Sequence, residues 1–197
     1  GVFFDNHVEF VKHFLKGQIA MEDVRRELMA QAAKMERTGL PLTHVDSHQH
    51  MHMLPGVIDI SLDVAASLHL DAVRISRTPL FTAFAGMGQL IGRLGLFTLS
   101  ELSLWKAKRR HFRVPDHFEG IVAGEAVHEG HFLHILKDLR PGTTEVMMHP
   151  GTDNEKLIPA CDWEHDFEAE MQAIVSPKVR RMIADKAVKV VNYRDLK

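Results

Sequence analysis

The stretch Thr43-His44-Val45-Asp46-Ser47-His48-Gln49-His50-Met51-His52 carries most of the information on fold and function. Four histidines and one aspartate occupy every second position from His44 to His52. Side chains alternate between the two faces of extended backbone, so along a strand all five would point the same way. Imidazole and carboxylate groups are the usual ligands of zinc and other divalent metals. The pattern therefore predicts a metal-binding or catalytic edge where a strand runs into a loop.

A helix is the competing conformation for this stretch, because His44, His48 and His52 have the i,i+4 spacing that shares a helix face. The flanking prolines and the β-branched residues within the stretch favour a strand followed by a loop. One metal cannot bind all five groups in extended backbone, since eight steps of about 3.3 Å span roughly 26 Å. We expect one or two ligands, with the other residues orienting them or contacting substrate. The alternative without a metal is a hydrogen-bonded polar strand end.

Helices and strands are predicted to alternate on both sides of this stretch. Helices are expected over 22–38, 57–69, 81–112, 126–139 and 164–185, the last with a break at Ser176-Pro177. Strands are expected at 43–47, 71–76, 118–122, 144–148 and 188–191. This alternation predicts an α/β fold with parallel strands, in which the chemistry lies at the carboxyl ends of the strands. No linker divides the chain, so residues 1–197 are expected to form a single domain.

A second motif, His149-Pro150-Gly151, follows the predicted strand at 144–148. Proline fixes the backbone after the histidine, and glycine allows a ligand to approach closely. A histidine held in this way can bind a metal or donate a proton to a leaving group near neutral pH. Alone, the motif also fits a structural histidine. Arg74, in the strand at 71–76, can contact a substrate anion or hydroxyl, or pair with a structural carboxylate.

Composition limits the range of partners and locations. The chain has 197 residues and a formal net charge of −2, which favours neither nucleic acid nor an anionic membrane as the main partner. The apolar tract Leu80–Leu99 contains polar residues and glycines, so no stable membrane span is expected. The single cysteine, Cys161, excludes an internal disulfide and fits a cytoplasmic protein, and no secretory signal is recognised at Gly1.

The two motifs together resemble those of the YdjC-like carbohydrate deacetylases, which include the chitooligosaccharide deacetylases. The resemblance rests on the 43–52 stretch followed by Pro55, and on Glu27-Leu28-Met29-Ala30-Gln31 before it. Arg74, Val146-Met147-Met148-His149-Pro150-Gly151 and Asn192-Tyr193-Arg194-Asp195 follow in the same order. The helical segment at 81–112 is most similar to the branch associated with hopanoid biosynthesis.

The resemblance implies a distorted (β/α) barrel of the polysaccharide-deacetylase type and a divalent metal, Mg or Zn, bound by one aspartate and two histidines. His48 is the ligand that it assigns to this chain. The other two family ligands lie in segments that we do not recognise here, so the barrel is expected to be incomplete at its N-terminus. An open barrel leaves sheet edges uncovered. Pairing with a second copy, as a homodimer, is one way to cover them; residues upstream of Gly1 are another.

The expected activity is hydrolysis of the acetyl amide of an N-acetylated sugar. The candidate residues are His48 for metal binding, His149 and Asp46 for catalysis, and Arg74, His50 and His52 for substrate binding. Within the His–Asp row, Asp46, His50 and His52 are expected to orient the metal ligand or contact the sugar. The competing hypotheses are a metal-dependent phosphoesterase on a similar barrel and a non-catalytic domain that binds a metal or a partner.

Overall fold

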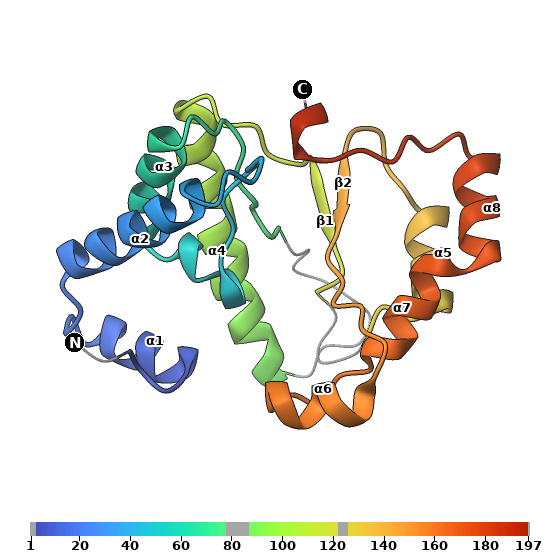
Figure 1. Cartoon of the computed structure of the whole chain (residues 1–197), viewed down its shortest axis with the longest axis horizontal. Helices are drawn as coiled ribbons and strands as arrows, with labels where there is room; N and C mark the ends of the chain where they lie inside the picture. The colour runs from blue at the N-terminus through green and yellow to red at the C-terminus, as the bar shows by residue number, and fades with distance from the viewer. Residues whose placement is uncertain (1–2, 78–86, 122–125, 197) are drawn as a thin grey trace. The chain divides into compact units, whose positions relative to one another are not determined.

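The computed structural model describes residues 3–77, 87–121 and 126–196, which form two compact units (Figure 1). The first unit comprises residues 1–114 and 193–197, and the second comprises residues 115–192. Helices and short parallel strand pairings occur together, so the fold belongs to the α/β class. Whether residues 1–197 act as a single barrel-like domain stays a prediction.

The first unit is built around a buried helix. Its elements are α1 (His7–Leu15), α2 (Met21–Glu36), η1 (His48–Met53), α3 (Val57–Ser67), α4 (Met87–Arg109) and η2 (Tyr193–Asp195). Helix α3 is apolar on nearly all sides, which is typical of a helix inside a core. Its residues Ile58 and Leu62 pack with Met53, Val73 and Ile75 in one cluster. Its residues Ile60 and Val64 pack against α2 in a second cluster.

Within the described residues of the first unit, parallel pairing consists of single bridges, Val45 with Val73 and Ala72 with Arg113. The backbone N–H of Val45 donates to Ala72, and that of Arg74 donates to Val45. The predicted strands at 43–47 and 71–76 therefore lie side by side in parallel but are much shorter than expected. The first shortens because the chain leaves extended backbone at His48 and turns.

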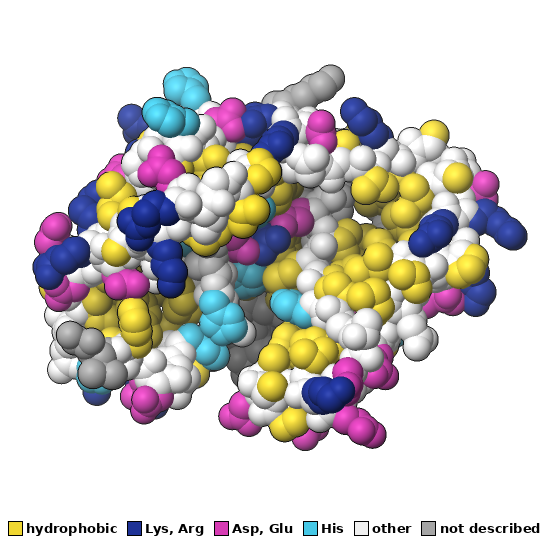
Figure 2. Space-filling model, in the orientation of Figure 1, with side chains coloured by type: hydrophobic (Ala, Val, Ile, Leu, Met, Phe, Trp, Pro, Cys, Tyr) yellow, Lys and Arg dark blue, Asp and Glu magenta, His cyan; other side chains and the backbone are white. Residues whose placement is uncertain are grey.

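The second unit holds β1 (His117–Glu119), α5 (Glu129–Lys137), β2 (Thr144–Val146), α6 (Asn154–Cys161), α7 (Phe167–Val175) and α8 (Pro177–Asp185). Strands β1 and β2 pair in parallel, with Phe118 opposite Glu145. Helix α5 packs on α7 and α8. Figure 2 shows hydrophobic side chains on the visible face of this unit, and Ile174, Val175 and Val190 are among its exposed residues.

Most predicted helices are confirmed, within a few residues at each end. The predicted break at Ser176-Pro177 is confirmed, because Ser176 caps α8 and the proline stands at its first turn. Residues 81–86 of the expected 81–112 helix and residues 80–86 of the Leu80–Leu99 tract lie outside the described residues. Residue 122 of the expected strand at 118–122 does so as well. The strand predicted at 188–191 is wrong, since the described residues offer it no ladder partner. No described helix is long and apolar enough to cross a bilayer.

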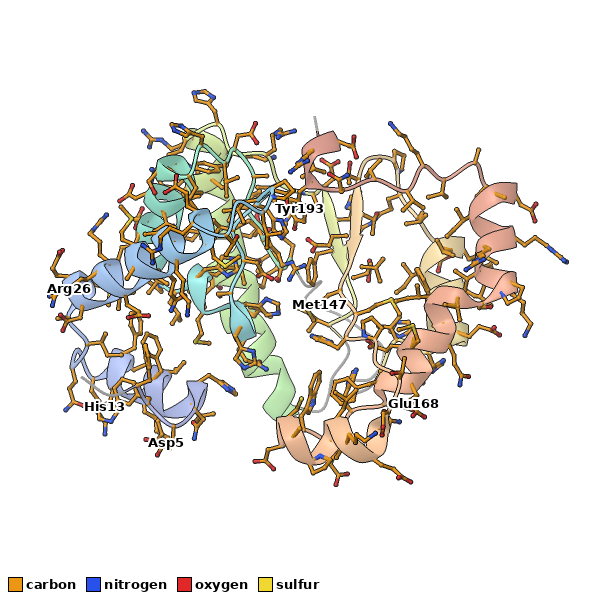
Figure 3. The ribbon with its side chains drawn as sticks, viewed as in Figure 1. Asp5, His13, Arg26, Met147, Glu168 and Tyr193 are labelled. Atoms are coloured by element: carbon orange, nitrogen blue, oxygen red, sulfur yellow. The ribbon has the colours of Figure 1, made fainter. Side chains whose placement is uncertain are left out.

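Gly120 joins β1 to the following loop in a backbone conformation that a side chain would disrupt. Its φ is 97°, and a Cβ there would clash with the carbonyl oxygen of Met147, which is labelled in Figure 3. We expect Gly120→Ala to lower the free energy of unfolding by about 3 kcal/mol or more. Backbone strain contributes about 1–3 kcal/mol, and overpacking contributes about 1–3 kcal/mol.

Gly130→Ala is the matched control in the same unit, because its Cβ would make an ordinary contact of 3.4 Å with the His128 ring. Helix α5 should keep its stability or gain up to about 1 kcal/mol from this change. Urea denaturation of both variants measures the difference. Equal midpoints for Gly120→Ala and the wild type would contradict the close approach to Met147.

Candidate functional site

The His–Asp row folds into a tight turn rather than an extended strand. Gln49 and His50 have φ values of 51° and 57°, in the left-handed region, so the alternation of side chains stops after His48. The five side chains therefore do not share one face, as they would along a strand; the chain leaves extended backbone after Ser47, where a loop was expected. The turn instead gives each residue of the row a different environment.

His52 is buried at 2% exposure and fixes the turn. Its Nε2 lies 2.7 Å from the carbonyl oxygen of Arg74, and its Nδ1 lies 2.8 Å from Oγ of Ser47. A carbonyl oxygen only accepts, so Nε2 carries the proton and Nδ1 accepts from Ser47. Oγ of Ser47 also accepts from the backbone N–H of His52, at 2.8 Å. Both ring nitrogens are engaged within the protein, which favours the orienting role over contact with a sugar.

Asp46 and Arg74 form an ion pair across the two adjacent segments. One Asp46 oxygen accepts from the backbone N–H of Ser47 at 2.7 Å, and lies 4.0 Å from Nδ1 of His52. Of the two predicted roles of Arg74, pairing with a carboxylate is the one seen here. The pair holds the start of the turn against the segment that contains Val73.

His48 and His50 differ in accessibility. Nδ1 of His50 lies 2.8 Å from Oγ of the fully buried Ser76, which anchors the ring. His48 is exposed, and the ring of His7 meets it edge-on at 6.1 Å between centroids. The described residues make no hydrogen bond to the His48 ring nitrogens. His48 is therefore the most accessible histidine of the row.

The end of the chain supports the start of the same row. The His44 ring stacks on Tyr193, labelled in Figure 3, with centroids 3.6 Å apart and planes 4° from parallel. Arg194 donates to the carbonyl of Pro41, and Arg113 donates to the carbonyls of Arg194 and Leu196. Tyr193 and Arg194 of the Asn192-Tyr193-Arg194-Asp195 motif thus have a structural role next to the His–Asp row.

A second cluster lies in the other unit, on the loop that follows β2. His149, His165 and Glu170 place one ligand atom each within 4.8 Å of the others, and this is the group of metal-type side chains found among the described residues. Glu170, on α7, is 1% exposed. Its Oε1 accepts from the backbone N–H of Val127 at 2.9 Å, and its Oε2 accepts from the backbone N–H of His149.

Aromatic rings surround His149. The ring of Trp163 meets it edge-on at 4.9 Å, and the ring of His165 does so at 5.4 Å. Trp163 in turn stacks on His165 at 4.0 Å and 23°. Trp163 is 37% exposed, whereas His165 is 6% exposed. His149 is thus held in a half-buried position beside an indole that is open to solvent.

Asp166 fixes the start of α7, which carries Glu170. The side-chain amide of Asn154 and the backbone N–H of Ala169 donate to its carboxylate at 2.8 and 2.9 Å. The Asn154 hydrogen bond, followed by the one from Ala169, holds the pKa of the Asp166 carboxyl below its usual range. The helix therefore begins at a fixed place relative to the loop after His149.

The sequence prediction missed His165 and Glu170. One signal was available for Glu170, because it lies three residues after Phe167 and three before Ala173. All three are on the buried face of α7. A carboxylate on an apolar stripe indicates a buried, partnered charge. His165 precedes the helix and has no such periodicity, so the sequence offers no signal for it.

The donors in the described residues fit the implied metal in part. Around the His–Asp row, His48 is the exposed imidazole, while Asp46 pairs with Arg74 and His52 is engaged at both nitrogens. Zinc sites need three or four protein ligands. His48 therefore fits as one ligand, and the described residues beside it do not complete a metal site.

Comparison with known proteins places this geometry in a family context. The chain is similar to carbohydrate deacetylases of Mus musculus, at 28% identity over 98% of this chain and 68% of the relative. Similar proteins of the same name occur in Thermoanaerobacter pseudethanolicus, at 27% over 90% of this chain and 61% of the relative, and in Brevibacillus brevis, at 24% over 89% and 62%. The chain thus spans about three fifths to two thirds of the length of these relatives.

The model of the family described as YdjC-like protein matches residues 1–185. This range includes the turn at His48–Met53, Arg74 and the His149-Pro150-Gly151 loop. The predicted resemblance is confirmed, and the chain belongs to the YdjC-like protein family.

Proposed function

We propose that this protein hydrolyses the acetyl amide of an N-acetylated sugar. One structural observation carries the proposal. Ser47, Ser76 and Arg74 hold Asp46, His50 and His52 in place, while His48 stays exposed. A turn held rigid around one accessible imidazole is suited to present a ligand, because preorganisation lowers the cost of binding. The names of the similar carbohydrate deacetylases support the same substrate class.

The proposed architecture is a distorted (β/α) barrel. Three parallel pairings support it, and each joins a segment to the next one along the chain: Val45 with Val73, Ala72 with Arg113, and β1 with β2. Sequential parallel neighbours are the connectivity of such barrels. Completion of the barrel by a second copy, as a homodimer, stays a prediction. A cytoplasmic location is also still a prediction, and it rests on the single, unpaired Cys161.

The proposed metal ligand on this chain is His48, for Mg or Zn. A divalent metal supplies polarisation of the acetyl carbonyl and a lower pKa for the attacking water. His52 and Ser47 fix the turn from which His48 projects. Asp46 is the proposed general base, which takes a proton from the attacking water. Its ion pair with Arg74 fixes the orientation of its carboxylate. His50, anchored by Ser76, is the proposed contact for a sugar hydroxyl.

The proposed proton donor is His149. Asp46 takes a proton from the water as it adds to the acetyl carbonyl, the C–N bond breaks, and the departing nitrogen must gain a proton to leave as an amine. An imidazole exchanges protons near neutral pH, so His149 can supply it. The products are acetate and the free amino sugar, which balances the reaction.

Removal of the metal provides a direct test of this function. We expect the protein, expressed from its complete reading frame, to release acetate from N,N′-diacetylchitobiose. Dialysis against a chelator should abolish that release, and added Zn²⁺ or Mg²⁺ should restore it, because the metal activates the carbonyl and the water. Acetate is measured by an enzyme-coupled assay.

A phosphomonoester substrate in parallel separates this function from the phosphoesterase hypothesis. Turnover of the phosphomonoester without acetate release would contradict deacetylation. Acetate release that is insensitive to the chelator would contradict the metal role of His48.

A further inference from the structure

Glu170 is a buried carboxylate that links two segments of the second unit. It is 1% exposed, and its two oxygens accept from the backbone N–H groups of Val127 and His149. Burying a charge is costly unless hydrogen bonds satisfy it. An apolar residue would be less costly on the buried stripe of α7. The carboxylate therefore points to a specific requirement at the backbone of His149.

His165 contacts both Glu170 and the His149 ring. Its Nε2 lies 3.2 Å from Oε1 of Glu170, a contact at ion-pair distance whose angle is not that of a hydrogen bond. One face of its ring stacks on Trp163, and its ring stands perpendicular to that of His149, at 85°. A buried ring in this place limits the rotation of the His149 side chain, because packed side chains occupy few rotamers.

We propose that Glu170 and His165 are positioning residues for His149. Glu170 fixes the main chain of His149 by accepting its N–H, and His165 fixes the direction of its imidazole by packing against it. This inference rests on the proposed function, in which His149 donates a proton to the leaving amine. A displacement of about 1 Å in such a group costs on the order of 100-fold in rate.

A metal bound by His149, His165 and Glu170 is the competing use of the same residues. Each Glu170 oxygen already accepts a backbone N–H, and a metal would compete with these bonds for the carboxylate. The three ligand atoms lie within 4.8 Å of one another. One of these pairs, Nε2 of His165 and Oε1 of Glu170, is 3.2 Å apart, which is close to the roughly 3.3 Å between ligands on tetrahedral zinc, given metal–nitrogen distances near 2.05 Å. The hydrogen bonds of Glu170 favour positioning.

The kinetic test uses Glu170→Gln, which keeps the shape of the side chain but replaces one acceptor oxygen with a donor. We expect kcat for N,N′-diacetylchitobiose to fall about 100-fold, with little change in KM, because His149 is displaced. An aryl acetate should be cleaved at nearly the wild-type rate, because its phenolate leaves without a proton. His165→Phe, which keeps the ring and removes the nitrogens, should lose less than His165→Ala on the amide substrate.

Glu168→Gln is the matched control on the same helix, labelled in Figure 3. Glu168 also accepts a backbone N–H, from Asn154 at 3.1 Å, but among the described residues it makes no hydrogen bond or ion pair with His149 or His165. Both substrates should be turned over at the wild-type rate in this variant. Equal losses on amide and ester in Glu170→Gln would overturn the proposal, because they would indicate general damage to the fold.

Histidine labelled with ¹³C at Cε1 separates this inference from the proposed function. The His149 signal, assigned by its loss in His149→Gln, should be single and sharp in the wild type, and shifted or broadened in Glu170→Gln. An unchanged signal would overturn positioning, even if the protein releases no acetate and the proposed function fails. Stoichiometric Zn²⁺ binding that is lost in His165→Phe would also overturn it, in favour of a metal centre.

Discussion

Replacing His149 with alanine is expected to lower kcat for an N-acetylated sugar by about 10²–10⁴-fold, the range typical of lost acid–base catalysis. The amine of the sugar is a poor leaving group without a proton, and the proposed function assigns that proton to His149. KM should change little, because the loss falls on bond cleavage rather than on binding. Steady-state kinetics with N,N′-diacetylchitobiose measure both constants.

An exposed histidine of the same unit supplies the control. His134 lies on α5, its side chain is 71% exposed, and it pairs with Asp138 at 3.5 Å. His134→Ala should leave kcat and KM at their wild-type values. If His149→Ala retained wild-type kcat, the proton would have to come from another group, and the proposed role of His149 would be wrong.

Replacing His48 is expected to remove metal and activity together. Loss of residues that merely orient a ligand costs about 10–100-fold in metal affinity. Loss of a ligand itself should lower the metal affinity by about 100-fold or more. We expect His48→Asn to show weaker Zn²⁺ binding by calorimetry and no measurable acetate release. The fold should persist, because His48 is exposed and makes no hydrogen bond through its ring within the described residues.

His111→Asn is the matched control for His48→Asn. His111 is also exposed in the first unit, and its φ of 60° suits asparagine. Its Zn²⁺ affinity and acetate release should equal those of the wild type. Unchanged Zn²⁺ affinity in His48→Asn would contradict ligation by His48. Weakened binding with retained turnover would contradict the need for the metal.

The sequence predicted helices well where local signals act alone. The break between α7 and α8 follows from Ser176, which caps the second helix, and from Pro177, which cannot continue the first. Helix α3 was predictable from its continuous apolar character. These features depend on neighbours in the sequence, so their signals survive without knowledge of the fold.

The geometry of the His–Asp row was not predictable in the same way. Alternation from His44 to His52 is compatible with a strand, yet the chain enters the left-handed region at Gln49 and His50. Neither residue is glycine, so the local sequence does not predict a turn at this position. Burial of His52, the carbonyl of Arg74 and the hydroxyl of Ser76 stabilise it, and the last two come from a distant segment. Tertiary contacts therefore decide which histidine is exposed.

The second cluster illustrates the same limit. The His149-Pro150-Gly151 loop was recognised from its motif, but its partners were not. Glu170 lies 21 residues after His149 and reaches its backbone N–H. His165 is held beside them by stacking on Trp163, and no regular spacing in the sequence predicts that contact. The sequence thus identifies the chemical groups, whereas the structure identifies the residues that hold them.

Proton NMR of the reaction mixture tests the central claim most directly. The protein, expressed from its complete reading frame and loaded with Zn²⁺ or Mg²⁺, is incubated with N,N′-diacetylchitobiose while acetate and free amino sugar are followed together. We predict that the two products appear in equal amounts and that both appear about 10²–10⁴-fold more slowly with His149→Ala. Absence of acetate from the folded, metal-loaded wild-type protein would contradict the proposed deacetylation.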